Sequence, residues 1–402
     1  MDGKQLRGLK PEMECFLERY AVHFGHANNL VHARQLLHGL LDGSDRRNVE
    51  NIAEAVEGGV VRTLQKFVSQ GAWDDRAVLG ELRSQVVEAM GDEKAVICVD
   101  ETGFPKKGTK SVGVKRQYSG ILGRVDNCQV AVFLNYVSQG EHVLLDRRLY
   151  LPEEWAADLP RRREAGAPDD VVFRTKPELA LGMVAEAVAA NVPFRWVTGD
   201  SVYGDSPTFV QGLRALKKWY VLDISSEMRV WLRSPKRLPS GKAGERPLAV
   251  AEAVKQLPAG TWKKMIVAEG SQGPRVYEYA ERLVWFSEEG RPAPTFERLL
   301  FRRSIGQEAE IKFQRSNAPP QIKLPRLAEV GGSRWTIEQD FQAGKGECGL
   351  DEYETRGWVG WHHHTALSML ALLFLVLQRQ RLGKKRTADD GSRSACRVEA
   401  FA

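Results

Sequence analysis

Three acidic residues stand where separate elements can bring them together. Asp100 and Asp200 each close a short apolar run, and Glu338 lies in a helical segment far downstream. Carboxylates that converge from different elements can hold two divalent cations about 3.5–4 Å apart, which generate a nucleophile and neutralise charge at phosphorus. The sequence therefore predicts metal-dependent phosphodiester chemistry, with Asp100, Asp200 and Glu338 as metal ligands.

Two basic residues flank Glu338 at helical spacing. Arg334 lies four residues before it and Lys345 seven residues after it. On a helix that turns 100° per residue, both fall within roughly 40° of Glu338, so the three side chains share one face. An acid that can hold a metal then stands between two cations that can hold phosphate oxygens. The alternative for Arg334 and Glu338 is an exposed ion pair worth roughly a few tenths of a kcal/mol.

Other polar residues near these positions favour structural roles. Asp205 directly precedes Ser206, where capping a helix is the simpler task. Glu101 follows Asp100 directly, and strand alternation turns it to the opposite face, so it is not predicted as a ligand. Three consecutive histidines, 362–364, cannot all face one ion from a regular helix, so we expect them to pack near the core.

The loop after Asp100 is basic. No acid occurs between Pro105 and Val125. The residues predicted to contact DNA phosphates here are Lys106, Lys107, Lys110, Lys115 and Arg116. Beside a metal site they would grip the DNA backbone through contacts that are independent of sequence and sensitive to salt. A solvated hairpin is the alternative.

The positive charge is concentrated in one segment. Between Ile224 and Glu329 there are 19 Lys+Arg and 12 Asp+Glu, a surplus of 7 in a chain whose net charge is +6. Such a segment is expected to face a polyanion, although a solvated face explains the same composition. Trp231, Trp262 and Trp285 in this segment could stack on unpaired bases, but packing in a small β domain is the simpler expectation.

Length and composition indicate an ordinary globular protein. A chain of 402 residues predicts two or three domains, and 43% hydrophobic content excludes a disordered or fibrous class. Five well-separated cysteines without a C-x-x-C pair argue against a zinc finger and suit a reducing cytoplasm. No secretory signal is visible. The apolar stretch Thr365–Leu377 has 13 residues, where a membrane span needs about 20, so a buried helix is predicted.

The first 90 residues have helical periodicity. Val78, Leu82 and Val86 recur every fourth position. Upstream, the segments Asn48–Val56 and Val61–Val68 form two short helical patterns separated by two glycines. A helix-turn-helix that presents a helix to DNA is one interpretation, and a plain helical hairpin is the other.

Strand-like runs begin at Ala95. The predicted strands are Ala95–Val99, Gln129–Val137, His142–Tyr150, Phe194–Thr198 and Trp219–Ile224, and the predicted helices between them are about 176–190 and 206–217. Thr175 and Glu178 could form a capping box for the first of these helices. The order β-β-β-α-β-α-β predicts an α/β fold, a mixed sheet with helices on its faces, and such proteins usually build sites at strand ends.

The segment after Ile224 breaks into short alternating runs with proline and glycine, which predicts a β-rich insertion before helix returns near Leu327. The predicted division is 1–90, an N-terminal helical and DNA-binding domain; 91–224, the first part of the core; 225–326, the basic β-rich insertion; 327–380, the helical second part of the core; and 381–402, a disordered tail.

Three sequence blocks resemble the DDE-superfamily transposases of bacterial insertion sequences. They are VDETGFPKKG at 99–108, TGDSVYGD at 198–205 and RWTIEQDFQAGKGECGLDEYETRGWVGWHHH at 334–364. The chain is similar to the insertion-sequence 701 branch, which is related to a cut-and-paste group with the signature Y-x-x-R-x-x-x-E-x-x-x-x-x-x-K. Arg334, Glu338 and Lys345 match its last three positions, whereas Gly331 stands at the tyrosine position. The role of that ring is therefore not carried over.

The resemblance implies an RNase H-like core with a β-strand insertion between Asp200 and Glu338. It implies two Mg²⁺ or Mn²⁺ ions, and as partners the terminal inverted repeats of a mobile element and a target, both double-stranded DNA. It further implies that the protein is a homodimer when two element ends are synapsed. The expected location is the bacterial cytoplasm, in association with the nucleoid, and no membrane partner is expected. The expected reaction is phosphodiester hydrolysis followed by strand transfer.

Two other functions are open. One is a standalone RNase H-like nuclease, which cuts but does not join. The other is a catalytically silent, transposase-derived DNA-binding protein. All three acids and both flanking cations are present, which argues against the silent protein.

Overall fold

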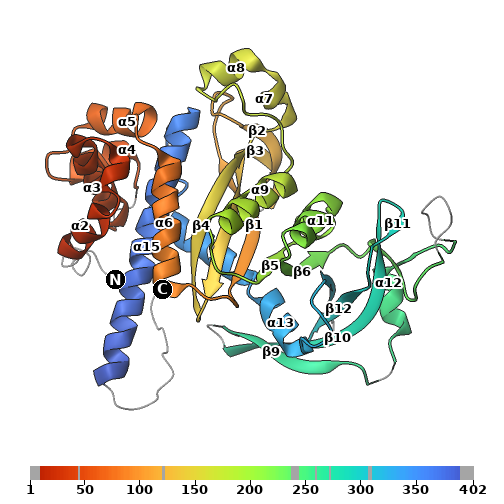
Figure 1. Cartoon of the computed structure of the whole chain (residues 1–402). Coiled ribbons are helices and arrows are strands. Elements are labelled where there is room, and N and C mark those ends of the chain that lie inside the picture. The colour runs from red at the N-terminus through yellow and green to blue at the C-terminus, as the bar shows by residue number, and fades with distance from the viewer. Residues whose placement is uncertain are drawn as a thin grey trace.

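The computed structural model describes residues 10–43, 46–119, 123–236, 244–258, 260–270, 273–306 and 310–389. Figure 1 shows an N-terminal group of helices, a central sheet with helices packed on it, and a β-rich region on the far side of the sheet. Cys396 and the predicted tail beyond residue 389 lie outside the described residues.

The N-terminal region is helical, as its periodicity predicted. Its elements are α2 (Lys10–Glu18), η1 (Ala21–Phe24), α3 (Ala27–Leu41), α4 (Val49–Ala55), α5 (Val61–Gln70) and α6 (Asp75–Met90). The side chains of Asn48 and Asp74 accept backbone N–H groups at the first turns of α4 and α6, so each caps its helix. Val78, Leu82 and Val86 are fully buried. The apolar stripe of α6 is therefore the face that packs on the rest of the fold.

The central sheet mixes parallel and antiparallel strands. Its elements are β1 (Val96–Pro105), β2 (Lys115–Ser119), β3 (Arg124–Ser138), β4 (Glu141–Tyr150), β5 (Trp196–Gly199) and β6 (Trp219–Ile224). β1 pairs antiparallel with β3 and parallel with β5, which pairs parallel with β6, while β2 and β4 both pair with β3. The predicted mixed sheet is confirmed.

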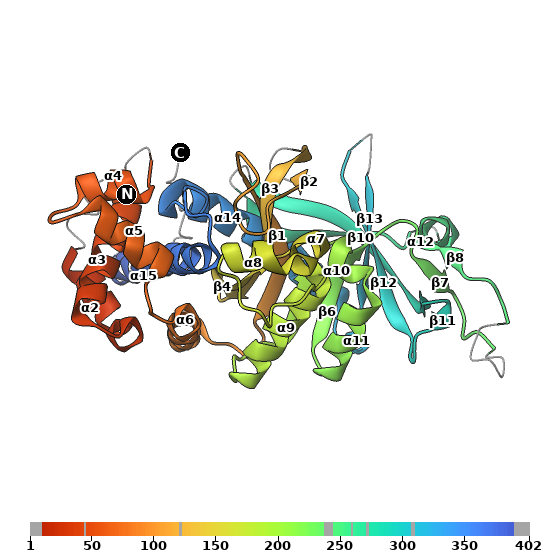
Figure 2. The same cartoon turned by 90° about the horizontal axis from the view of Figure 1, so that it is seen from above.

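Helices cover both faces of this sheet. α9 (Lys176–Ala189) and α11 (Pro207–Ala215) lie on one face, and α14 (Trp335–Cys348) lies on the other (Figure 2). The remaining helices beside the sheet are α7 (Glu153–Ala157), α8 (Leu159–Glu164), α10 (Ser201–Gly204) and α13 (Leu324–Gly332). The capping box of α9 is confirmed, because Thr175 and Glu178 each accept the other's backbone N–H.

The β-rich segment continues the central sheet. Its elements are β7 (Arg229–Trp231), β8 (Leu248–Ala249), α12 (Val250–Ala253), η2 (Val254–Gln256), β9 (Lys263–Gly270), β10 (Gly273–Glu288), β11 (Arg291–Pro292), β12 (Glu297–Ser304) and β13 (Ile311–Ser316). β13 pairs antiparallel with β6, so the last strand of this segment extends the sheet from its β6 side. The segment also has a small apolar core of its own around Val230, Phe286 and Phe301.

A buried ionic network joins this segment to the rest of the sheet. Arg315 contacts Glu288 and Glu297 at 2.9 and 3.0 Å, and Arg214 on α11 contacts the same two acids. Glu297 also accepts the hydroxyl of Tyr220 at 2.8 Å. Arg315 is 1% exposed. Part of the positive surplus of this segment therefore stabilises the fold and is not available to a polyanion.

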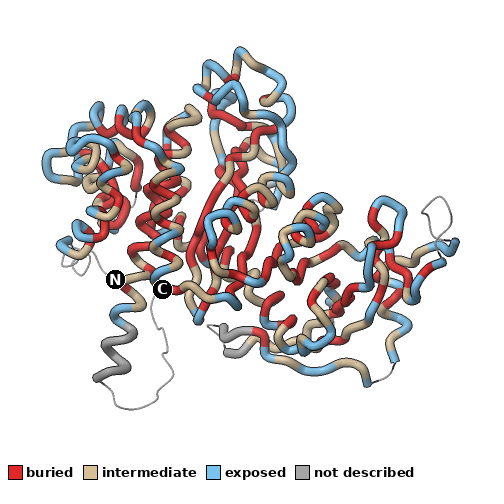
Figure 3. The backbone as a smooth tube through the Cα atoms, in the orientation of Figure 1, coloured by how far each residue is buried: buried red, intermediate tan, exposed pale blue. Residues whose placement is uncertain are grey.

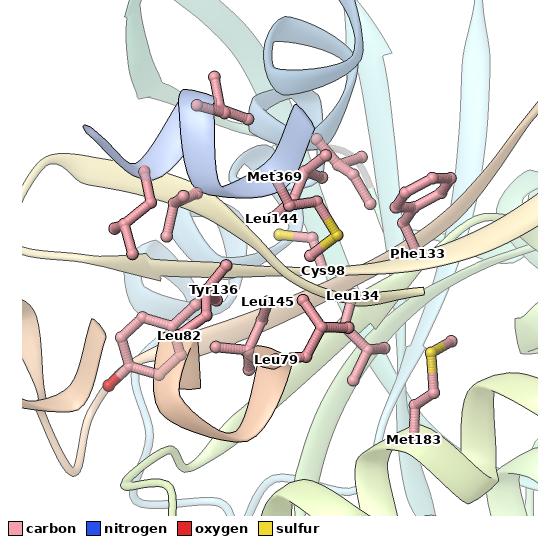
Figure 4. Packing of buried hydrophobic residues seen from close by; sticks show 14 of the residues in the cluster. Leu79, Leu82, Cys98, Phe133, Leu134, Tyr136, Leu144, Leu145, Met183 and Met369 are labelled. Carbon is pink, nitrogen blue, oxygen red and sulfur yellow. The ribbon is translucent and has the colours of Figure 1, made fainter. Parts of the chain in front are cut away.

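One long helix crosses the centre of the molecule. α15 runs from Trp358 to Asp389, and its segment Trp358–Leu382 is long and apolar enough to cross a membrane, but 89% of the apolar window is buried within the fold. Figure 3 shows this buried stretch beside the sheet, and Figure 4 shows Met369 in the same cluster of buried side chains as Leu144, Cys98 and Phe133. The prediction of a buried core helix is confirmed.

The predicted disordered tail begins too early. α15 continues past residue 381 to Asp389. Once the buried turns of a helix have formed, each further residue adds a hydrogen bond, and the Gln, Arg, Leu and Lys residues that follow are good helix formers. The helix therefore extends beyond the point where its apolar face ends.

Candidate active site

The first two acids lie next to each other in the sheet. Val99 of β1 is paired with Gly199 of β5 in parallel register, so Asp100 and Asp200 occupy the next positions of two adjacent strands. Asp200 is also the N-cap of α10, and its Oδ1 accepts the Val202 backbone N–H at 2.9 Å. Parallel pairing therefore brings together two residues that are 100 positions apart in the chain.

An arginine joins these acids to the glutamate. Arg334, the N-cap residue of α14, places Nη1 3.0 Å from Asp100 Oδ2 and Nη2 3.0 Å from Glu338 Oε1. The Asp100 side chain is 15% exposed and that of Glu338 is 35% exposed. Arg334 thus links Asp100 and Glu338, with its guanidinium between the two carboxylates.

The negative charges of Asp100 and Asp200 are buried without enough positive charge nearby to offset the cost. Burial, reinforced by the charges of Asp200 and Glu101 and opposed by Arg334, raises the pKa of Asp100 to about 7. Burial, followed by the charge of Glu101, raises the pKa of Asp200 to about 6. One arginine does not offset this concentration of negative charge. Perturbed carboxyl groups of this kind are typical of functional sites.

A fourth carboxylate on this edge escaped sequence reasoning. Leu222 of β6 is paired with Gly199 in parallel register, which puts Asp223 in the same row as Asp100 and Asp200. Asp223 Oδ2 lies 3.7 Å from Arg334 Nε. An acid inside the apolar run Trp219–Ile224 was the available signal, because an acid rarely enters a buried strand without a partner.

Glu101 faces the other side of the sheet, as strand alternation predicted. Its carboxylate contacts Lys176 Nζ at 2.6 Å and accepts the hydroxyl of Tyr203 at 2.7 Å. These partners belong to α9 and α10. Glu101 nevertheless influences the site, since its charge is the largest electrostatic contribution raising the pKa of Asp200.

The donor set suits a hard divalent cation in its chemistry. Carboxylate oxygens are the ligands that Mg²⁺ and Mn²⁺ prefer, and a cation would offset the charge that burial leaves uncompensated. In the part of the chain that the structure describes, no three acidic, histidine or cysteine side chains are grouped closely enough to hold one ion. The guanidinium of Arg334 stands between Asp100 and Glu338. The residue types fit the metal, whereas the arrangement of the described side chains does not group three of them around one ion.

Lys345 points toward the core. Its Nζ donates to Thr102 Oγ1 at 2.8 Å and to the Gly103 carbonyl at 3.1 Å, both on β1. Burial lowers the pKa of Lys345 to about 8. The helical face predicted to carry Arg334 and Lys345 is therefore the face of α14 that contacts β1. In this arrangement the Lys345 ammonium group contacts the strand.

The basic loop divides into two groups. Lys106 donates to the Tyr353 carbonyl at 3.0 Å and lies over that ring, and burial lowers its pKa to about 8. Lys110 and Lys115 are paired with Glu164 and Glu154 at 2.9 and 2.7 Å.

Two basic residues of the same loop face solvent. Lys107 and Arg116 are exposed, and both belong to the connection and strand that follow β1. Lys110 is exposed as well, although it is paired with Glu164, so the contact with Tyr353 withdraws only Lys106 from the accessible cations of the loop. The accessible ones are the better candidates for contact with a phosphate backbone.

The three histidines are structural, as predicted. His363 bonds the carbonyls of Val68 and Trp73 at 2.9 and 3.1 Å, and His364 bonds that of Gly349 at 2.8 Å. Burial lowers the pKa of His362 to about 3 and that of His364 to about 4. His363 therefore holds α15 against the end of α5, and His364 holds it against the residue that follows α14.

The remaining polar and aromatic candidates also have structural contacts. Asp205 does not cap α11, because Ser206 does so, and its carboxylate instead accepts the Ser225 backbone N–H at 3.0 Å. Trp231 is 4% exposed and donates to the Glu245 carbonyl at 2.8 Å. Trp262 lies under the Arg303 guanidinium at 4.2 Å. Trp285 packs edge-on against Phe296, with the ring centroids 5.9 Å apart.

Comparison with known proteins places the chain in a family. A protein from Microchaete diplosiphon named "Probable transposase for insertion sequence element IS701" is 31% identical over 189 residues, which are 47% of this chain and 47% of that protein. The chain thus matches about half the length of this curated relative. Among solved structures, the NurA nuclease from Sulfolobus solfataricus is 7% identical, with a TM-score of 0.24, over 81% of this chain and 94% of that one. A TM-score this low carries no argument.

The family match covers most of the described core. Residues 19–280 match the family described as "DDE superfamily endonuclease", a span that includes Asp100, Asp200 and Asp223 and ends before α14. The mixed sheet flanked by helices is consistent with the RNase H-like fold expected for such an enzyme. This chain belongs to the DDE superfamily endonucleases.

Proposed function

We propose that this enzyme is a transposase that cuts DNA at the ends of a mobile element and joins those ends to a target. The observation that carries the proposal is the row formed by Asp100 within β1 and Asp200 directly after β5, faced by Arg334 and Glu338 from α14. The partial similarity to a protein named as a probable insertion-sequence transposase supports the same reading.

Asp100, Asp200 and Glu338 would hold the Mg²⁺ or Mn²⁺ ions in this proposal, and two ions are expected. Bound there, divalent metal supplies charge neutralisation at phosphorus and a more acidic water. Arg334 is held among the acids and would turn its terminal nitrogens to phosphate oxygens when DNA enters. Lys345 would hold β1 against α14, which keeps Asp100 at a constant distance from the helix.

The proposed reaction has two steps at one site. Water first attacks the phosphodiester at the element's end, which yields a 3′-hydroxyl and a 5′-phosphate. The freed 3′-hydroxyl then attacks a target phosphodiester in line, so that one P–O bond forms as another breaks. Both steps require the acids to be ionised, and cation binding favours that form.

The partners follow from this chemistry. Double-stranded DNA would be held by exposed cations such as Lys107 and Arg116 through contacts to its backbone. Two element ends must be present together for strand transfer, so we propose a homodimer in the DNA complex. The N-terminal helices, which include the pair α4 and α5, are proposed to bind DNA as well. The proposed location of the protein is the bacterial nucleoid.

The test uses a plasmid that carries the DNA flanking the coding sequence on both sides. With Mg²⁺, the wild-type protein should release the intervening segment, and Asp100→Asn should reduce cleavage by about 10³-fold or more while DNA affinity changes less than about threefold. Asp170→Asn, at an exposed position, is the matched control and should cleave like the wild type. Cleavage by Asp100→Asn at the wild-type rate would remove the catalytic assignment.

A strand-joining assay separates the proposed transposase from the two other functions. Ends that are already cut, with free 3′-hydroxyl groups, are mixed with target plasmid. Joined products identify a strand transferase, cutting without joining identifies a nuclease, and binding without either identifies a silent DNA-binding protein.

A further inference from the structure

A buried glutamine from the β-rich segment reaches the row of acids. Gln314 of β13 lies opposite Asp223 of β6, and its Nε2 donates to Asp223 Oδ1 at 2.7 Å. Gln314 is fully buried. Among the described residues its Oε1 has no hydrogen-bond partner, so the bond to Asp223 is the one that orients the side-chain amide.

Gly331 makes room for this glutamine. A Cβ atom at position 331 would lie 2.8 Å from Gln314 Nε2 and 3.2 Å from Val221 Cγ1. Real Cβ atoms are not found closer than about 3 Å to such neighbours, so the Gln314 amide, as the end of a side chain, would have to shift. A larger residue at 331, such as the tyrosine of the related signature, would displace Gln314 from Asp223.

The second carboxylate oxygen of Asp223 faces the Nε atom of the Arg334 guanidinium. Asp223 Oδ2 is 3.7 Å from Arg334 Nε, a distance for an ion pair and too long for a hydrogen bond. The terminal nitrogens Nη1 and Nη2 point instead to Asp100 and Glu338, each at 3.0 Å. The guanidinium is therefore approached from three sides, and each nitrogen faces a different acid.

We propose that Gln314 and Asp223 form a positioning arm that holds the Nε side of Arg334. The inference rests on the proposed function, in which the terminal nitrogens of Arg334 leave the acids for phosphate. An arginine side chain loses rotamer entropy when its position is fixed, and a guanidinium already held at Nε loses less of it when Nη1 and Nη2 change partners. Asp223 and Gln314 are positioning residues, since neither would touch DNA.

The arm also connects two parts of the chain. Gln314 belongs to the last strand of the β-rich segment, whereas Asp223 and Arg334 lie at the end of the sheet that carries the acids. A displacement of β13 would pass through the Gln314 amide to Asp223 and then to the guanidinium. The β-rich segment thereby sets the orientation of a side chain within the site.

The spectroscopic test follows the Arg334 Nε–Hε signal by NMR in protein labelled with ¹⁵N-arginine, assigned by its loss in Arg334→Lys. Asp223→Asn keeps an oxygen for the Gln314 amide but removes the charge that faces Nε, and Gly331→Ala displaces Gln314 with Asp223 intact. Both variants should shift or broaden the Arg334 signal. Glu329→Gln, which removes an exposed ion pair with Arg326 on α13, should leave it in place.

The kinetic test measures kcat and KM for plasmid cleavage together with Tm. Asp223→Asn and Gly331→Ala should lower kcat about 10–100-fold, with KM for DNA within about twofold and with the folded fraction unchanged. An Arg334 signal in Asp223→Asn that coincides with that of the wild type overturns the arm. So does a loss of kcat that only matches a loss of folded protein.

Failure of the proposed function would be visible separately. If the wild-type protein cleaves no DNA, the transposase assignment fails, and the NMR signal alone then decides whether Asp223 and Gln314 position Arg334.

Discussion

Arg334 Nη1 lies 3.0 Å from Asp100 Oδ2, so the N-cap residue of α14, the helix that carries Glu338, contacts an acid within β1. The contact spans 234 positions of the chain. Burial alone would lower the pKa of Arg334, but the charges of Asp100, Asp223 and Glu338 outweigh it and raise the pKa. The arginine therefore stays charged in the site and can exchange carboxylate partners for phosphate.

Lys345 gives a prediction about pH. Burial lowers its pKa to about 8, so below that pH the fold bears a buried charge, and stability should rise as pH increases from about 8 toward the unfolded value of about 10.5. Lys345→Met should lose the part of this rise that belongs to Lys345 and keep the part that belongs to Lys106, whose pKa burial also lowers to about 8, and urea unfolding at pH 7 to 10 would measure the difference. Lys66→Met on the exposed face of α5 serves as control and should follow the wild-type slope. Parallel slopes for Lys345→Met and the wild type would contradict the burial argument.

The exposed cations of the basic loop predict a salt effect. Replacing Lys107 and Arg116 together by alanine should weaken DNA binding for all sequences and reduce the slope of log K against log salt by about 1.8, or about 0.9 per phosphate contact. The matched control replaces Lys110 and Lys115, whose ammonium groups are already paired with glutamates, and should change the slope less. Fluorescence anisotropy between 50 and 200 mM salt measures the slope for each double variant. Equal slopes would contradict the claim that Lys107 and Arg116 contact phosphates more than Lys110 and Lys115 do.

A close approach of backbones at Gly204 predicts a loss of stability. A Cβ there would lie 1.9 Å from the Asp223 carbonyl oxygen, so Gly204→Ala must push α10 from β6. We expect a cost of about 1–3 kcal/mol, and lower cleavage because α10 begins at Asp200. Gly346→Ala meets nothing within 4 Å in α14 and should stabilise by about 0.5–1 kcal/mol. Urea unfolding compares them, and a neutral Gly204→Ala would contradict the packing.

Acid stability depends on the pair Asp75 and Arg147. Burial disfavours the Asp75 charge, but Arg147 and nearby histidines outweigh it and lower the pKa of Asp75 to about 2. This stabilisation is present above about pH 4 and is lost as pH falls through 2. Asp75→Asn should cost about 2 kcal/mol at pH 7, and its difference from the wild type should shrink between pH 4 and 2.

The measurement for this pair is urea unfolding across that pH range. Arg147 is 1% exposed and would keep Thr365 Oγ1 and the His362 carbonyl as partners at 3.1 and 2.9 Å. Asp170→Asn, at an exposed position, should leave the pH profile unchanged. A constant difference between Asp75→Asn and the wild type down to pH 2 would show that the charge of Asp75 is not the cause.

Local pattern predicted much of the secondary structure. The run Trp219–Ile224 became β6 with the same bounds, and the helix predicted from about Lys176 begins there in the structure. Hydrophobic periodicity and caps act over a few residues, so a sequence displays them directly. The boundary near residue 381 was wrong because helix propagation continues beyond the buried face that nucleates it.

The candidate site was predicted in part. Asp100 and Asp200 were recognisable as acids that close apolar runs, and the shared face of Arg334 and Lys345 followed from helical spacing. Their roles in metal and phosphate binding stay predictions. The inward direction of Lys345 was not readable, because the sequence does not show that Thr102 and Gly103 would lie opposite it.

By itself, the sequence determined which residues share a helix face and why three adjacent histidines cannot bind one ion. It predicted that Asp100 closes the first strand, whereas β1 continues to Pro105. Only the tertiary structure decided that Asp223 joins the row of acids and that Gln314 reaches it from β13. The physical reason is that strand register between distant segments is set by packing and pairing across the whole sheet, whereas periodicity records only which face of a segment is buried.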